Sequence, residues 1–144
     1  MTEQPEDAMV QAWARLARTE QATMSRIEGE LKQASLPSLD WYDVLLELSR
    51  EPQGMLRPVE LERRLLLAQY NTSRLIDRMT RAGLIERRAC PDDGRGQFVA
   101  ITRAGKEMQR RMWRVYGAAI AKHVGTKLTL GDAHTLYELL GKLL

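Results

Sequence analysis

The stretch Arg88-Ala-Cys-Pro-Asp-Asp-Gly-Arg-Gly-Gln-Phe-Val-Ala-Ile-Thr-Arg-Ala-Gly105 places a cluster of turn-forming residues between two short runs that suit β-strands. Its centre, Pro91-Asp-Asp-Gly-Arg-Gly96, combines the residue types that favour tight turns. The runs on either side, residues 84–89 and 97–102, are short and compatible with extended structure. The sequence therefore predicts a β-hairpin with Pro91 to Gly96 at its tip.

Residues 57–65 and 69–82 predict the two helices of a helix-turn-helix, joined by a short apolar turn. Pro58 suits the first turn of the earlier helix, because the N–H that proline lacks has no intrahelical partner there. Glu60 follows near the positive end of the helix dipole. Gly83 stands where a left-handed cap would end the second helix.

The second of these helices has the features of a recognition helix. Leu75, Ile76 and Met79 form a narrow apolar stripe, and polar residues occupy the remaining surface. One face can therefore anchor the helix while the other presents hydrogen-bond donors and acceptors. With the hairpin that follows, residues 38–103 predict a winged helix-turn-helix, an α+β fold that is mostly α with a small β-hairpin wing.

Helices from both ends of the chain flank this core. Residues 6–34 place apolar side chains, Trp13 among them, at steps of three and four, which predicts one long amphipathic helix whose apolar stripe needs a partner. Pro37 breaks it, and Ser38 can cap the next helix. After the hairpin, Thr102 can cap a helix over about 103–124. Thr129 then begins a last helix with a capping-box pattern.

Positive charge is concentrated in the middle of the 144-residue chain. Residues 57–111 carry 13 Lys and Arg against seven Asp and Glu, whereas the remainder carries nine against 12. A central basic module of this kind is typical of nucleic-acid-binding proteins, and a solvated charged face is the alternative. The apolar runs are far shorter than the ~20 residues of a membrane helix. One cysteine excludes an intrachain disulfide framework and fits a reducing compartment, so we expect a cytoplasmic protein without membrane contact.

Enzymatic and metal sites find little support in the sequence. Asp92 and Asp93 are adjacent, whereas calcium loops need ligands at alternating positions and a late acidic residue. His123 and His134 stand apart from other ligands at zinc-site spacing. No Ser/His/Asp or Cys/His nucleophile pattern is recognisable. We therefore expect no catalytic residue, metal or cofactor. Cys90 has arginine neighbours that could favour a reactive thiolate, so oxidant sensing stays open for it.

Six separate motifs resemble the MarR family of bacterial transcriptional regulators, and the order of the elements agrees. The interval from Arg95 to Thr102 equals the family's interval between the last wing Arg and the Thr of its Leu-Thr-x-x-Gly motif. The motifs are Leu39-Asp-Trp-Tyr-Asp-Val-Leu45, Val59-Glu-Leu61, Ser73-Arg-Leu-Ile-Asp-Arg-Met79, Ala82-Gly-Leu-Ile-Glu-Arg87, Pro91-Asp-Asp-Gly-Arg95 and Ile101-Thr-Arg-Ala-Gly105. The resemblance covers nearly the whole chain and implies a single MarR-type domain over residues 1–144.

The wing departs from the family pattern at two positions. Cys90 stands where the family usually has Asp, and Gly94 replaces the first wing Arg. The resemblance implies that Arg95 reaches into the minor groove of DNA and that Asp93 helps to hold it in position. We expect the loss of the first Arg to remove a phosphate contact or one anchor of the wing.

The resemblance further implies a homodimer that binds a pseudo-palindromic double-stranded DNA operator, with residues 6–34 and 104–144 forming the dimerisation helices. At the recognition helix the base-reading candidates are Gln69, Tyr70, Asn71, Ser73 and Arg74. Arg78 is expected to contact a phosphate. The natural pairings are Asn or Gln with adenine and Arg with guanine. The expected activity is that of a repressor.

Family members are commonly released from DNA by small phenolic or anionic molecules, so an aromatic or anionic effector is implied here too. Trp13, Tyr42 and Trp113 are candidates for its pocket, although tryptophans at helical spacing usually serve core or dimer packing. Two rival functions stay open. The protein could sense oxidants through Cys90, or it could be a ligand-binding interaction protein that does not bind DNA.

Overall fold

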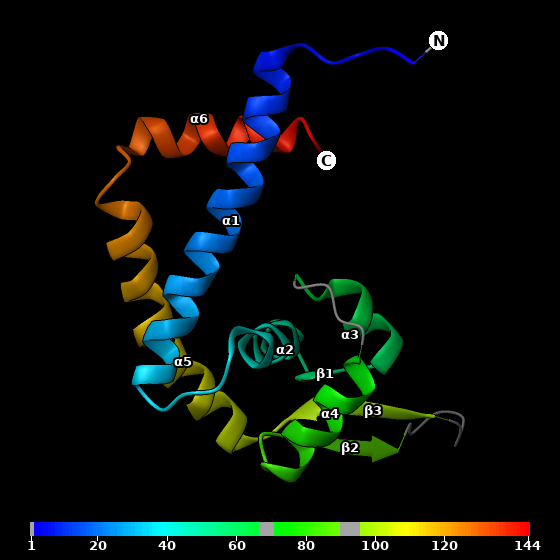
Figure 1. Cartoon of the computed structure of the whole chain (residues 1–144). Helices are drawn as coiled ribbons and strands as arrows, with labels where there is room; N and C mark the ends of the chain where they lie inside the picture. The colour runs from blue at the N-terminus through cyan, green and yellow to red at the C-terminus, as the bar shows by residue number, and fades with distance from the viewer. Residues whose placement is uncertain (1, 67–70, 90–95) are drawn as a thin grey trace.

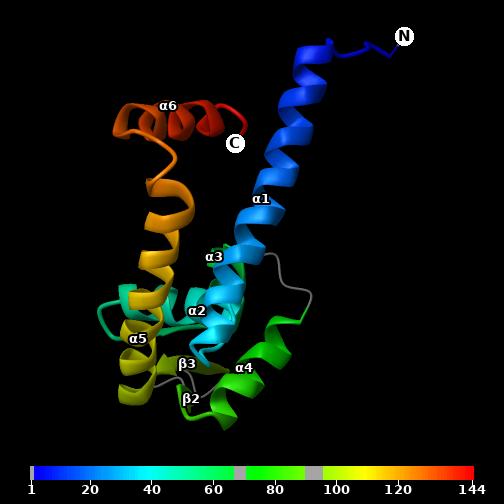
Figure 2. The ribbon, with the colours of Figure 1, turned by 60° about the vertical axis from the view of Figure 1, so that its left-hand side comes forward.

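The chain folds into a small mixed core that carries a long helical extension (Figure 1). The computed structural model describes residues 2–66, 71–89 and 96–144. Helix α1 runs beside α5, and α6 crosses the end of the molecule where both chain termini lie. Figure 2 shows the same arrangement from another side, with the strands at the end opposite to α6.

The secondary structure confirms the predicted fold class, mostly α with a small β-sheet. The sequence pattern placed the helices and the two strands of the hairpin to within a few residues. The helices are α1 (Asp7–Gln33), α2 (Leu39–Arg50), α3 (Pro58–Arg64), α4 (Thr72–Arg81), α5 (Arg103–Ile120), the π-helix η1 (Ala121–Gly125) and α6 (Leu130–Gly141); the strands are β1 (Met55–Leu56), β2 (Ile85–Ala89) and β3 (Gln97–Ile101).

The strands form an antiparallel sheet in the order β1-β3-β2. Strands β2 and β3 are the two arms of the predicted hairpin, in a register that pairs Ile85 with Ile101. Strand β1 was not predicted. It pairs Leu56 with Val99 of β3, and thereby connects the hairpin to the segment just before α3.

The hydrophobic core lies where α2, α3, α4 and the sheet meet. Its side chains come from every one of these elements, so the helix-turn-helix and the hairpin share one interior. Ile27 and Leu31 of α1 and Met112 of α5 extend the same core toward the helical extension. The fully buried side chains include Leu45, Leu48, Leu61, Leu75, Met79, Ile85 and Val99.

One local prediction was wrong, and another gave the extent of a helix correctly but not its geometry. Ser38 precedes α2 but makes no capping hydrogen bond to it; its hydroxyl bonds Asp40 instead. The first amide of α2, that of Leu39, donates to Oε1 of Glu28 on α1 at 2.7 Å, so a distant side chain replaces the local cap. The helix that begins at Arg103 was expected to continue to about residue 124, but its α-helical geometry ends at Ile120 and a π-turn follows.

The π-turn brings two adjacent side chains onto one carboxylate of α1. Lys122 Nζ donates to Glu30 Oε1 at 3.0 Å, and His123 Nε2 lies 3.4 Å from Glu30 Oε2. Both residues belong to η1, so the segment that follows α5 contacts α1 through two neighbouring side chains. This cluster fixes α1 against the end of α5.

In the described part of the chain, the helices all fall short of the length and apolar character that a membrane span requires.

Candidate nucleic-acid interface

Helix α4 has one buried and one exposed face, as its sequence predicts. Thr72, Leu75, Ile76 and Met79 are buried against the core. The predicted contact residues Asn71, Ser73, Arg74 and Arg78 are all exposed, and Arg81 extends their face by one turn. The helix can therefore enter a groove with its polar face while its apolar face stays anchored.

The C-terminal end of α4 is fixed by a glycine cap. Gly83 has φ +78°, a conformation that a β-carbon disfavours, and its N–H donates to the carbonyl of Thr80 at 3.0 Å. The N–H of Leu84 reaches the carbonyl of Met79 at 3.1 Å, which completes a Schellman motif. The predicted left-handed cap is confirmed.

Thr102 connects the end of α4 to the start of α5. Its hydroxyl donates to the carbonyl of Gly83 at 2.7 Å and accepts the N–H of Gly105 at 3.1 Å, which confirms the predicted cap of α5. Its own N–H donates to the carbonyl of Leu84 at 3.1 Å. A shift of α5 would thus be transmitted to the base of α4 through hydrogen bonds.

Arginines dominate the surface shared by α4 and β2. Arg87 of β2 pairs with Asp77 of α4, and Arg88 Nη2 lies 2.6 Å from Glu86 Oε1 on the same strand. Within the described ranges, Arg74 and Arg78 take part in no ion pair. Their charges are therefore available to phosphates or base edges.

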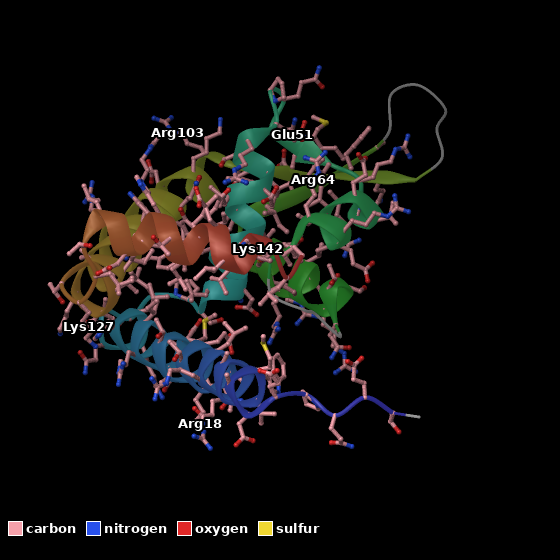
Figure 3. All side chains as sticks on the ribbon, turned by 90° about the horizontal axis from the view of Figure 1, so that it is seen from above. Arg18, Glu51, Arg64, Arg103, Lys127 and Lys142 are labelled. Atoms are coloured by element: carbon pink, nitrogen blue, oxygen red, sulfur yellow. The ribbon has the colours of Figure 1, made fainter. Side chains whose placement is uncertain are left out.

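A further ion pair joins the helices on the sheet side of the core. Arg64 of α3 pairs with Glu51, the residue that ends α2, and the two side chains lie next to each other in Figure 3. The Glu51 hydrogen bond is the main reason that the pKa of Arg64 lies above its ordinary value. The pair holds α3 close to α2, which keeps the first helix of the helix-turn-helix in place.

Several predicted site residues lie outside the described residues. These are Gln69 and Tyr70 before α4, Asp93 and Arg95 between β2 and β3, and Cys90. Their roles in base reading, in the wing and in oxidant sensing stay predictions. The described arms of the hairpin, Ile85–Ala89 and Gln97–Ile101, pair in the register that the wing prediction requires.

Two of the three aromatic residues predicted for an effector pocket lie together. Tyr42 of α2 and Trp113 of α5 stack with ring centroids 6.3 Å apart, and Tyr116 packs edge-on against both. They border a cavity of about 180 Å³, to which Met24, Leu39, Asp43, Leu46 and Leu66 also contribute. An apolar cavity of about 150 Å³ can hold a benzene molecule, so one aromatic ring fits here.

The cavity is connected to the turn that precedes α4. Asp43 is buried on α2, and its Oδ2 accepts the N–H of Leu66 at 2.6 Å. Leu66 and Asp43 both line the cavity. Burial raises the pKa of the Tyr116 hydroxyl, and the neighbouring Tyr42 and Asp43 raise it further. The phenol therefore stays protonated as a hydrogen-bond donor.

Trp13, the third predicted pocket residue, is not brought to this cavity within the subunit. Its side chain is 68% exposed near the N-terminal end of α1. Met9 and Val10 beside it are also exposed, whereas Ile27 and Leu31 at the other end of α1 are buried. The predicted apolar stripe of α1 is therefore covered over its second half only.

Sequence reasoning missed three residues of this region. Asp43 has a visible signal, because an acidic residue interrupts the apolar face of α2. Tyr116 belongs to the apolar stripe of the helix that begins at Arg103, so its sequence position indicates packing and not a pocket. Arg57, whose guanidinium carbon lies 5.1 Å from the ring centroid of Phe98, carries no local signal.

In the described parts of the chain, groups of three or more His, Cys, Asp or Glu side chains placed to hold a metal ion are absent.

Comparison with known sequences identifies relatives of the central part of the chain. The sequence profile of the MarR family matches residues 34–96. The multiple antibiotic resistance protein MarR of Escherichia coli is 31% identical over 87 residues, which are 60% of this chain and 60% of that protein. The chain thus aligns with about three fifths of the curated relatives that it matches.

Solved structures extend the likeness to nearly the whole chain. AbsC, a MarR family transcriptional regulator from Streptomyces coelicolor, superposes with a TM-score of 0.86 and 25% identity, over 99% of this chain and 95% of that one. Sco3205 from the same organism, a MarR family transcriptional regulator solved in complex with DNA, gives a TM-score of 0.89 at 22% identity, over 99% and 89% of the two chains. The motifs and these matches together show that residues 34–96 carry the sequence pattern of the MarR family and that the chain has the winged-helix fold of MarR family regulators.

Proposed function

We propose that this protein is a sequence-specific DNA-binding transcriptional repressor that binds a pseudo-palindromic operator as a homodimer. The observation that carries the proposal is the pair of faces on α4. Leu75, Ile76 and Met79 anchor the helix in the core, and Arg74 and Arg78 project from the opposite face. The likeness to Sco3205, which was solved in complex with DNA, supports the same use of the fold.

The exposed side chains of α4 suggest a division of roles. Asn71, Ser73 and Arg74 lie at the N-terminal end of the helix, the end that reaches base edges in a helix-turn-helix. Gln69 and Tyr70 precede them in the sequence and share the base-reading role in the proposal. Arg78 lies one turn further along, where a guanidinium is suited to a phosphate.

The wing completes the proposed DNA contact. Arg95 would enter the minor groove, where narrow A/T-rich segments attract guanidinium groups. Asp93 would orient it. Residues 38–103 then form the DNA-binding core, and residues 6–34 and 104–144 form the dimerisation helices. The oxidant-sensing role of Cys90 stays a separate prediction.

Exposed apolar side chains support dimerisation through both chain ends. Every residue of α6 is exposed, including Tyr137 and the leucines of the helix, and Trp13 and Val10 are exposed on α1. Figures 1 and 2 show α6 and the N-terminal half of α1 at the same end of the molecule, opposite to the hairpin. An apolar surface of this kind favours association with a second copy, and a two-fold dimer would present two α4 helices to successive major grooves.

The cavity beside Tyr42, Trp113 and Tyr116 is the proposed effector site. It lies between the helical extension and the DNA-binding core, and it is sized for a small aromatic molecule, phenolic or anionic in character. A ligand that displaced Asp43 from the N–H of Leu66 would release the chain at Leu66, two residues after α3. Such a ligand lowers DNA affinity only if it binds the released state more tightly.

Competition electrophoresis tests the proposed function. Labelled DNA from upstream of the coding gene is expected to shift with the protein, and unlabelled DNA of the same sequence to compete far better than unrelated DNA. The variant Arg74→Ala provides the matched control, because it keeps the fold while removing one base-reading candidate. Equal competition by both DNAs would instead favour the ligand-binding interaction protein whose basic face is incidental.

A further inference from the structure

We propose that Arg57 is a positioning residue for the wing: its guanidinium stacks on Phe98, holds the β2–β3 hairpin against the start of α3, and thereby supports the wing's DNA contact. The inference rests on the proposed DNA-binding function and names a contact that the family motifs do not contain. Arg57 is not required to touch DNA itself.

The register of the sheet places the two residues opposite each other. Strand β1 pairs Met55 with Ala100 and Leu56 with Val99. The next position along this antiparallel ladder sets Arg57 against Phe98, where the strand gives way to α3. Directly opposed side chains of neighbouring strands are close enough to interact.

The contact has the geometry of a cation–π interaction. The guanidinium carbon of Arg57 lies 5.1 Å from the centroid of the Phe98 ring, within the range of about 6 Å in which the attraction is significant. Both side chains are half-buried, so water screens the contact only in part.

Arg57 also extends along β3 toward its first residue. Gly96 has φ +76°, and a β-carbon there would lie 3.6 Å from Nη1 of Arg57. The guanidinium therefore spans the backbone from Phe98 to Gly96, the last described residue before β3. One long side chain from the start of α3 thus lies along the beginning of β3, at the end of the hairpin arm far from its Ile85–Ile101 base.

The sequence gives a reason why this wing needs such a contact. Gly94 stands where the family usually has the first wing Arg, and glycine adds backbone freedom. Strand β1 supports the hairpin over two residues only. Phe98 lies just beyond the last residue of β3 that β1 pairs with, so the contact with Arg57 supports the hairpin where the strand pairing of β1 has ended.

Binding measurements with the full-length protein and its operator DNA test the proposal. We expect Arg57→Ala and Phe98→Leu each to weaken operator affinity about three- to tenfold, and the double variant to be no weaker than either single variant, because the two residues act as one unit. Phe98→Tyr, which keeps the ring, is expected to retain wild-type affinity. Arg63→Ala, an exposed arginine on the same helix, serves as the charge control.

A direct phosphate contact by Arg57 gives a different pattern. It would make Arg57→Ala lower the salt dependence of binding while Phe98→Leu stayed at wild-type affinity, and that result would overturn the proposal. Additive losses in the double variant would overturn it as well. Under the proposal, Phe98→Leu lowers the salt slope as much as Arg57→Ala does, because both release the same wing contact.

Hydrogen exchange of the DNA-free protein separates positioning from general destabilisation. The proposal expects faster amide exchange in Ile85–Ala89 and Gln97–Ile101 of both variants, with α2 and α5 unchanged. Uniformly faster exchange would overturn it. If wild-type protein does not discriminate operator from unrelated DNA, the proposed function fails first. If it does discriminate and Phe98→Leu binds like wild type, only the role of Arg57 fails.

Discussion

Gly105 of α5 and the carbonyl oxygen of Leu84 lie so close together that a β-carbon on residue 105 would come within 2.1 Å of that oxygen. The approach brings the first turn of α5 onto the chain that leaves α4. Thr102 bonds both neighbours of this contact, the carbonyl of Gly83 and the N–H of Gly105. The spacing of Thr102 and Gly105 is therefore a packing requirement for the placement of α5 against the end of α4.

Gly105→Ala is expected to destabilise the fold by about 1–3 kcal/mol, because backbone must move to admit the methyl group. Urea unfolding at a fixed protein concentration measures the effect. Gly29→Ala is the matched control: a β-carbon at Gly29, inside α1, has no neighbour within 4 Å, so alanine should stabilise by about 0.5–1 kcal/mol. Equal stabilisation by both substitutions would contradict the contact.

Arg74→Ala is expected to weaken operator binding by about 1–3 kcal/mol, with the loss concentrated at particular base pairs. The reason is that its exposed guanidinium near the start of α4 is suited to a guanine edge. Affinities for a panel of single-base operator variants measure this, with Arg114→Ala on α5 as the control. A uniform loss across the panel would assign Arg74 to a phosphate instead.

Arg95→Ala is expected to weaken binding at every site and to reduce the salt dependence of affinity. The reason is that each wing would lose the positive charge that enters the minor groove between the phosphates. Affinity measured over a series of salt concentrations reports both effects. An unchanged slope together with unchanged affinity would remove Arg95 from the wing role that the resemblance implies.

The sequence predicted correctly the helix ends and the buried helix face that depend on residues close together in the chain. Gly83 ends α4 with a positive φ, which glycine adopts readily, and Thr102 caps α5 with its own hydroxyl. In both cases the residue type alone indicates the local structure. The apolar spacing of Leu75, Ile76 and Met79 likewise gave the buried face of α4 correctly. These are interactions between residues a few positions apart.

The features that the sequence did not predict depend on partners far along the chain. Strand β1 is two residues long and exists through its pairing with β3. The cap of α2 comes from Glu28, and the contact of Arg57 is with Phe98. Ser38 had a suitable side chain, but Asp40 binds its hydroxyl, so a correct local rule gave the wrong partner.

Leu139→Glu is expected to shift the protein from dimer toward monomer and to abolish high-affinity operator binding. Leu139 is 53% exposed on α6 in the single subunit, and a charge placed there could not be desolvated in an apolar interface. Light scattering and operator titration measure the two effects. Lys142→Glu introduces the same charge at a polar position of the same segment and should leave the dimer intact.

Lys122→Ala is expected to reduce the acid sensitivity of the fold. The hydrogen bond from Lys122 is the main reason that the pKa of Glu30 lies below its ordinary value of 4.5, and the charge of Lys122 lowers it further. A carboxyl with a lowered folded-state pKa stabilises the fold fully above pH 4.5, and this contribution is lost as pH falls through the folded-state pKa. Unfolding free energies between neutral pH and pH 3 should therefore fall less steeply in Lys122→Ala than in wild type. Lys127→Ala, which also removes a lysine after α5, should keep the wild-type slope, and a wild-type slope in Lys122→Ala would show that the pair between α1 and η1 does not contribute.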